Sequence, residues 1–119
     1  MSDMSDAYSV NDHFVAKDPA VRKVYDELLK VLRRFGPVRE EAKKTSIHLV
    51  NSSALVGVEV RKDYLLLNIK ADHKIESPRV AKMEQISARR FHHKVKLSSP
   101  KEIDKELQGW LKNAYELSS

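Results

Sequence analysis

The chain of 119 residues contains no cysteine, only three glycines and only four prolines. Without cysteine, the sequence excludes disulfides, thiolate metal sites and a cysteine nucleophile. The scarcity of glycine disfavours a backbone loop that cradles phosphates, and neither a Gly-x-Ser-x-Gly elbow nor a dinucleotide-binding fingerprint is present. These absences favour a role other than catalysis, with an enzyme kept as an alternative.

Long apolar runs and a leader pattern are also missing. No stretch approaches the roughly 18 consecutive apolar residues of a membrane-spanning helix. Residues 1–6 have neither a basic start nor an apolar run, so they are not typical of a secretory signal. We therefore expect a cytoplasmic protein with no membrane partner.

Ligand sets for metals and cofactors are not evident. None of the five histidines has the i, i+4 spacing of a helical zinc site. His92 and His93 are neighbours on an expected strand, so they face opposite sides and do not grip one ion together. The carboxylates are spread along the chain without an obvious acid–base pair. We expect no metal and no cofactor.

What is present is the composition of a small globular domain, with 41% hydrophobic and 33% charged residues. Residues 1–12 are polar and without periodicity, which predicts a flexible tail. Residues 13–117 are then one domain.

Two amphipathic helices are expected, one near each end. Asp18 caps the first, which has helical apolar spacing over 21–35 and stops at Gly36-Pro37. Ser99 and Glu102 form a capping box before the second, whose apolar stripe runs from Ile103 to Ala114.

Alternating apolar residues predict strands over 45–50, 54–60 and 91–97. The run Tyr-Leu-Leu-Leu-Asn-Ile over 64–69 suggests a central strand that is apolar on both sides. Residues 71–90 fit no single pattern, and Ser77-Pro78 favours a short helical turn running to about Met83. The sequence thus predicts an α+β fold: an N-terminal helix, a four- to five-stranded, mostly antiparallel sheet, and a C-terminal helix.

The net charge of +5 is not evenly distributed. Residues 37–96 hold thirteen basic and seven acidic side chains, whereas the segments on either side are close to neutral. His92, Lys94 and Lys96 share the outward face of the expected strand 91–97, about 7 Å apart. Such a row suits nucleic acid or an acidic protein partner, and a plain solvated face is the alternative. The candidate residues are Arg79, Arg89, Arg90, Lys94 and Lys96.

A second candidate site combines two other residues. His93 alternates with Phe91, Val95 and Leu97, so it should point toward the core, either as a structural residue or at the base of a pocket. Lys44 enters a strand and could hold an anionic group beside it. No exposed aromatic residue alternates with the basic ones, so stacking of single-stranded bases is not expected.

The sequence resembles the domain of unknown function 5655 family. The resemblance runs from His13-Phe14 through Gly36-Pro37-Val38 and Lys44-Thr45, resumes at 91–100, and closes with Trp110-Leu111 and Ala114-Tyr115. It implies an α/β domain with a helix at each end and no established activity. Some members carry nuclease-like or restriction-related parts, which points toward nucleic acid by analogy. The resemblance also places Lys44 and His93 at recurrent family positions.

Three hypotheses follow. The first is a non-catalytic binding or accessory module whose basic sheet face meets a polyanion. The second is a small-ligand binding protein or enzyme with a pocket around Lys44 and His93. The third is a structural domain that self-associates into a homodimer through its strand edges.

Overall fold

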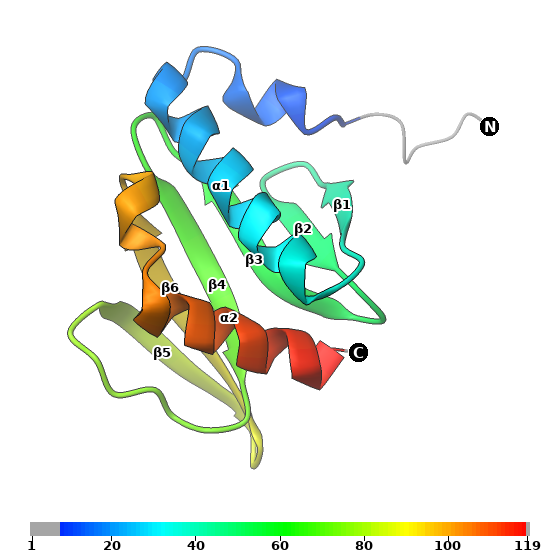
Figure 1. Cartoon of the computed structure of the whole chain (residues 1–119), viewed down its shortest axis with the longest axis vertical. Coiled ribbons are helices and arrows are strands. Elements are labelled where there is room, and N and C mark those ends of the chain that lie inside the picture. The colour runs from blue at the N-terminus through cyan, green and yellow to red at the C-terminus, as the bar shows by residue number, and fades with distance from the viewer. Residues whose placement is uncertain (1–7, 119) are drawn as a thin grey trace.

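Two helices pack on one face of a six-stranded antiparallel sheet in this computed structural model, which describes residues 8–118 (Figure 1). The predicted α+β class, with a helix at each end, is confirmed, but the sheet has six strands rather than four or five. In chain order, the elements are η2 (Asn11–Phe14), α1 (Pro19–Phe35), β1 (Arg39–Ala42), β2 (Ile47–Val50), β3 (Ala54–Val60), β4 (Leu65–Ala71), β5 (Val80–Ser87), β6 (Arg90–Leu97), η3 (Pro100–Glu102) and α2 (Lys105–Ser118).

The strands follow the order β1-β2-β3-β4-β6-β5 across the sheet, and each neighbouring pair is antiparallel. β4 and β6 are therefore interior strands, and β1 and β5 are the two edges. Residues 11 and 12, which the sequence places in a tail, belong to η2. Residues 1–7 of that tail lie outside the described residues.

Helix α1 forms where the local signals predict it. The Asp18 carboxylate accepts a hydrogen bond from the Ala20 amide, and Pro19 occupies the first helical position. The apolar stripe of α1 is buried, and its end is marked by Gly36 with φ +155°. The helix thus lies with one face on the sheet and its charged face in solvent.

The capping box predicted for the C-terminal helix is real but caps a different turn. Ser99 and Glu102 close η3, a single 3-10 turn. Helix α2 starts later, at Lys105, and Asp104 accepts a hydrogen bond from the Leu107 amide. Two successive caps therefore replace the single helix start that we expect from the sequence, and the kink between them directs α2 across β3 and β4 (Figure 1).

The helical turn predicted from Ser77-Pro78 to about Met83 is wrong, apart from a single turn that ends where β5 begins at Val80. The Val80 amide donates to the Ser77 carbonyl in a turn, and the chain then enters β5. Two register shifts in the β5–β6 ladder break the simple alternation of β5, which hides the strand from a pattern search. Strand β1 is also missed, because its sequence Arg-Glu-Glu-Ala has little intrinsic preference for a strand.

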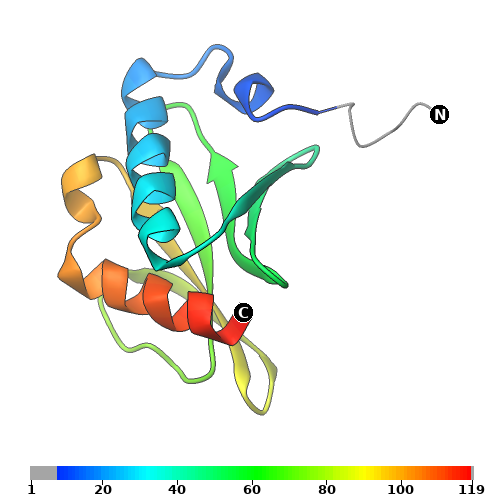
Figure 2. The ribbon, with the colours of Figure 1, turned by 45° about the vertical axis from the view of Figure 1, so that its right-hand side comes forward.

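Both helices lie on the same side of the sheet, as two views of the ribbon agree (Figure 2). Leu65, Leu67 and Ile69 of β4 are fully buried beneath them. The intervening β4 residues Leu66 and Asn68 belong to the opposite side because strand side chains alternate. We call that opposite side the open face, since no helix within residues 8–118 covers it.

Candidate functional site

Strand β6 divides its side chains between the core and the open face. His93, Val95 and Leu97 are fully buried against the helices. The alternate residues, His92, Lys94 and Lys96, therefore lie on the open face, which agrees with the alternation in the sequence. The sequence pattern thus places Lys94 and Lys96 on the correct side of the strand.

Neighbouring strands add cations to the same face. Lys94 is directly opposite Asn68 of β4 on one side and Lys82 of β5 on the other. His92 is opposite Lys70 of β4. We define the basic patch as the basic residues on this side of β4, β6 and β5: Lys70, Lys82, Arg90, His92, Lys94 and Lys96. Lys70 is buried, with 6% of its surface exposed, and the lowered pKa of His92 leaves that ring neutral at pH 7.

The basic patch has little internal compensation. Within residues 8–118, none of its side chains forms an ion pair with a carboxylate. Glu84, opposite His92, is the carboxylate that β5 contributes to this face. Like charges that face one another across strands, such as Lys82 and Lys94, repel each other and destabilise the sheet. An anion bound between them would reduce this repulsion.

The pKa values of two patch residues reflect burial and this crowding. Burial lowers the pKa of Lys70, and the nearby Arg90 guanidinium lowers it further. The Lys70 ammonium donates to the Ser53 hydroxyl at 3.1 Å. Burial also lowers the pKa of His92, while Glu84 acts in the opposite direction.

The remaining predicted arginines lie at the β5–β6 hairpin, Arg89 in the turn and Arg90 as the first residue of β6. Arg89 is exposed at the tip, beside Arg90, which is half-buried. The Arg90 Nε atom is buried without a hydrogen-bond partner among the described residues. The hairpin therefore adds positive charge at the end of β5 and β6, next to the basic patch.

His93 sits on the helix side and is fully buried. Its Nε2 accepts a hydrogen bond from the Ile75 amide at 2.9 Å, so Nδ1 carries the proton and faces the Ile69 carbonyl at 3.4 Å. Burial lowers the pKa of His93, which keeps the ring neutral. Backbone groups thus occupy both ring nitrogens, and His93 connects the β4–β5 segment to the sheet.

Arg79 is not part of the open face. Its guanidinium pairs with Asp104 at 2.9 Å and with Glu106 at 3.2 Å, donates to the Glu102 carbonyl and lies 5.8 Å from the Trp110 ring centroid. The hydrogen bond from the Leu107 amide, and then the one from Arg79, hold the pKa of Asp104 below its usual range. This corrects the expectation from the sequence: Arg79 holds the start of α2 to the β4–β5 segment.

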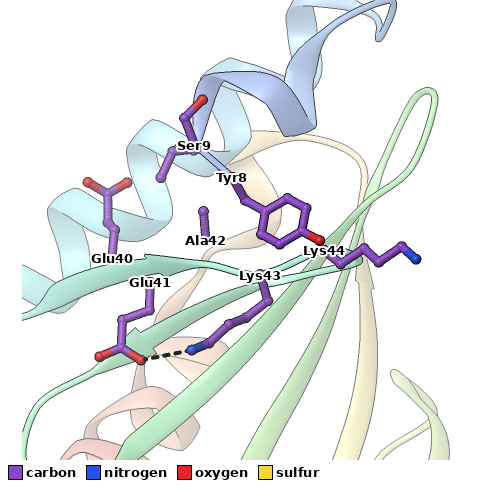
Figure 3. Close-up of a pocket in the computed structure, with 8 residues that line it drawn as sticks. Tyr8, Ser9, Glu40, Glu41, Ala42, Lys43 and Lys44 are labelled. Carbon is purple, nitrogen blue, oxygen red and sulfur yellow. Dashed lines mark ion pairs between the residues drawn. The ribbon is translucent and has the colours of Figure 1, made fainter. Parts of the chain in front are cut away.

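Lys44 lies at the opposite edge of the sheet, in the turn between β1 and β2. It lines a wide, open groove of about 730 Å³ together with Tyr8, Glu41 and Lys43, and its side chain extends away from Glu41 (Figure 3). Lys43, by contrast, forms a 3.7 Å ion pair with Glu41. His93 does not line this groove.

Comparison with known protein families adds the identity of the domain. The model of one family, described as Domain of unknown function (DUF5655), matches residues 10–118. The chain belongs to this family. A search of curated proteins and a search of solved structures each found no match.

For this DUF5655 member, the pocket expected around Lys44 and His93 is not formed. Lys44 lies in the β1–β2 turn and His93 lies on β6, and β3 and β4 separate β2 from β6 in the sheet. Moreover, Lys44 is exposed at an edge, whereas His93 is buried under the helices. A proton transfer shared by the two side chains is therefore not available in this fold.

Sequence reasoning missed several residues of the open face. Asn68 and Lys70 follow the run Leu65-Leu66-Leu67, which we interpret from sequence as a strand apolar on both sides. His48 lies opposite Gly57, which in turn lies opposite Asn68. The polar residues at even spacing within the β4 sequence were the available signal for a second, polar face.

Residues 8–118 contain neither a cluster of metal ligands nor a membrane-spanning helix. No group of three or more potential metal ligands comes together in this part of the chain. None of its helices is long and apolar enough to cross a membrane.

Proposed function

We propose that this domain is a non-catalytic binding module whose basic patch contacts a polyanion, and that this polyanion is nucleic acid. The observation that carries the proposal is the set of open-face cations on β4, β6 and β5 without carboxylate partners among the described residues. Unpaired lysines and arginines gathered on one uncovered face are the electrostatic footprint of nucleic-acid binding.

The spacing of the cations suits an extended anion rather than a point charge. Lys94 and Lys96 are two residues apart on one strand, roughly 7 Å, and neighbouring strands are about 4.8 Å apart. Phosphates follow one another closely along both strands of a duplex, so several lysines can engage at once. Contacts of this kind supply affinity and register without reading base sequence.

The same face offers little for base stacking. Tyr64 precedes β4, and the Lys96 ammonium lies 4.5 Å from its ring centroid, so a cation already covers that ring. Single-stranded binders usually rely on exposed aromatic rings. We therefore expect duplex DNA or RNA to bind through its backbone at least as tightly as a single strand of the same length.

The hydrogen bonding of the buried His93 favours a non-catalytic role. Both ring nitrogens of His93 are occupied by backbone groups, so the ring has no free nitrogen to take a proton from a substrate. His92 on the open face lacks a nucleophile beside it: its cross-strand neighbours are Lys70 and Glu84.

Fluorescence anisotropy tests the proposal with labelled duplex DNA, duplex RNA and single-stranded DNA, at about 50 and 200 mM salt. We expect duplex binding that weakens steeply between the two salt concentrations. The variant Lys94→Glu/Lys96→Glu should abolish it. The matched control Lys23→Glu/Lys30→Glu makes the same charge change on the exposed side of α1 and should retain most of the affinity.

Two outcomes would overturn the proposal. One is the absence of binding to every nucleic acid at the lower salt concentration. The other is an equal loss of affinity in both variants, which would assign the binding to net charge rather than to the basic patch. Poly-glutamate serves as a competitor: if it binds while duplexes do not, the partner is an acidic protein and the nucleic-acid proposal fails.

A further inference from the structure

Two shallow hollows lie on the open face, one on each side of the cross-strand pair Asn68 and Lys94. The first has a volume of about 90 Å³ and includes His48 and Gly57 in its lining. The second has a volume of about 60 Å³ and includes Lys82. Asn68 and Lys94 line both. The pair therefore forms the shared wall of a small polar depression near the middle of the sheet.

Asn68 has no evident structural task. It sits in the interior of β4, where asparagine is disfavoured, and its side chain forms no hydrogen bond within residues 8–118. Its Oδ1 atom is buried without a partner, so the polar atom that it presents to the hollows is Nδ2. That nitrogen carries two hydrogen-bond donors. The fold thus tolerates an unpaired amide whose donors are available to a ligand.

Gly57 opens one of the hollows. A Cβ atom at this position would meet only the Asn68 Cβ atom, at 3.7 Å, which is an ordinary van der Waals contact. Neither the backbone nor the packing therefore requires glycine here. A glycine inside a strand weakens it and often marks a place where a ligand approaches closely.

Lys82 and Lys94 add charge at the same point. They are direct cross-strand partners, an arrangement in which like charges repel. Among the lining carboxylates, Glu59 is paired with Arg61 at 2.8 Å, and Glu84 lies opposite His92. Positive charge therefore exceeds free negative charge beside Asn68, by an amount that suits an anion of one charge.

The size of the hollows restricts what they can hold. Their volumes correspond to two or three water molecules at about 30 Å³ each and are far below the roughly 300 Å³ of a small-molecule pocket. A whole nucleobase with its sugar is too large. A single phosphodiester group fits, because it is compact, carries one negative charge and accepts hydrogen bonds.

We propose that Asn68, Lys94 and Lys82 form an anchor for one phosphodiester group of the nucleic-acid backbone. The inference rests on the proposed function and deepens it, since it assigns one defined contact within the basic patch. The phosphate oxygens accept hydrogen bonds from Asn68 Nδ2 and from the two lysine ammonium groups, while the hollow over Gly57 receives the adjoining part of the backbone.

Duplex binding by matched variants tests the anchor. Lys94→Gln and Lys96→Gln remove the same charge from the same face of β6, but Lys96 lines neither hollow. Asn68→Val changes no charge and suits a strand. We expect Lys94→Gln and Asn68→Val each to weaken duplex binding by about tenfold or more, as for a hydrogen bond to a charged group. Lys96→Gln should lose no more than about fivefold, as for an exposed charge.

Gly57→Val provides a second variant whose fold should survive, because only an ordinary contact opposes its Cβ atom. It should weaken duplex binding without lowering the thermal stability, because valine suits a strand better than glycine does. If Asn68→Val and Gly57→Val bind as the wild type does, or if Lys96→Gln loses as much affinity as Lys94→Gln, the anchor is overturned. In that event, the proposed function of the basic patch still stands.

Titration with dimethyl phosphate, followed by NMR, separates the two proposals. The anchor predicts shifts at the Asn68 side-chain amide and the Gly57 amide, which Asn68→Val should remove from Gly57. If these shifts occur in a domain that binds no nucleic acid, the three residues bind a phosphodiester group but the proposed function fails. The absence of these shifts at saturating dimethyl phosphate contradicts the anchor.

Discussion

At the scale of single residues, the buried polar atoms differ in whether they are hydrogen-bonded. His93 is buried and fully hydrogen-bonded to backbone groups, whereas Asn68 is buried at Oδ1 and has no partner. A satisfied buried group is typical of a structural residue, and an unsatisfied one needs a separate explanation. This contrast separates His93, which stabilises the core, from Asn68, whose Nδ2 donors we assign to a phosphate; the anion has no proton to donate to the buried Oδ1.

The lowered pKa of His93 predicts how stability depends on pH. Burial, the largest cause, holds the folded-state pKa below the ordinary value of 6.5. Above that value both states are neutral, and the stabilisation is complete. As the pH falls below 6.5, His93 becomes protonated in the unfolded chain but stays neutral in the folded domain. The free energy of unfolding should then fall by up to about 1.4 kcal/mol per pH unit until the folded-state pKa is reached.

Urea unfolding between pH 7.5 and about pH 5 measures this slope. His92 contributes with the same sign, because its pKa is also lowered by burial. The variant His93→Gln isolates the buried ring: it should be less stable at neutral pH but show a shallower dependence on pH. Parallel pH profiles for the variant and the wild type would contradict the assignment.

How far the sequence predicts these residues depends on the distance to their partners. The orientation of Lys94, Lys96 and His93 follows from alternation along one strand, which is a local property. Arg79 is different, because its partners Asp104 and Glu106 are 25 and 27 residues away. Its run of basic neighbours predicts a surface cation, and only the tertiary structure pairs it.

At the scale of secondary-structure elements, helix ends were predictable and edge strands were not. The Asp18 carboxylate caps the start of α1 through the nearby Ala20 amide, and Gly36, with φ +155°, ends the helix, so residues at the two ends carry the signal. β1 and β5 form because β2 and β6 supply their hydrogen-bond partners. The sequence of β1 is charged and the pairing of β5 is irregular, so neither segment shows the residue pattern that predicts a strand.

The end of α1 provides a stability prediction at this scale. Gly36 has φ +155°, and a Cβ atom there would run into the Tyr115 hydroxyl, which donates to the Pro37 carbonyl at 3.1 Å. Gly36→Ala should therefore lower the free energy of unfolding by about 1–3 kcal/mol, through backbone strain and overpacking. Chemical denaturation measures the change.

A double-mutant cycle separates the two causes. Tyr115→Phe removes the hydroxyl, so Gly36→Ala should cost less in the Tyr115→Phe background than in the wild type. A cost that is identical in both backgrounds would mean that backbone strain alone, and not the contact with α2, makes glycine necessary at position 36.

At the scale of the whole molecule, the domain has two unlike faces. The helix side holds the hydrophobic core, whereas the open face over β4, β6 and β5 gathers unpaired cations. The charge count of residues 37–96 indicates a basic section, but it does not reveal that Arg79 leaves the patch or that Lys70 and Lys82 join it. Self-association through the strand edges stays a prediction, which light scattering can test.

The salt dependence of duplex binding tests the central claim most directly. Each phosphate neutralised by a lysine contributes about −0.9 to the slope of log K against log salt concentration. If the basic patch is the interface, the variant Lys82→Gln/Lys94→Gln/Lys96→Gln should reduce the magnitude of the wild-type slope by about 2 to 3. A slope that the triple variant leaves unchanged would show that the binding surface lies elsewhere.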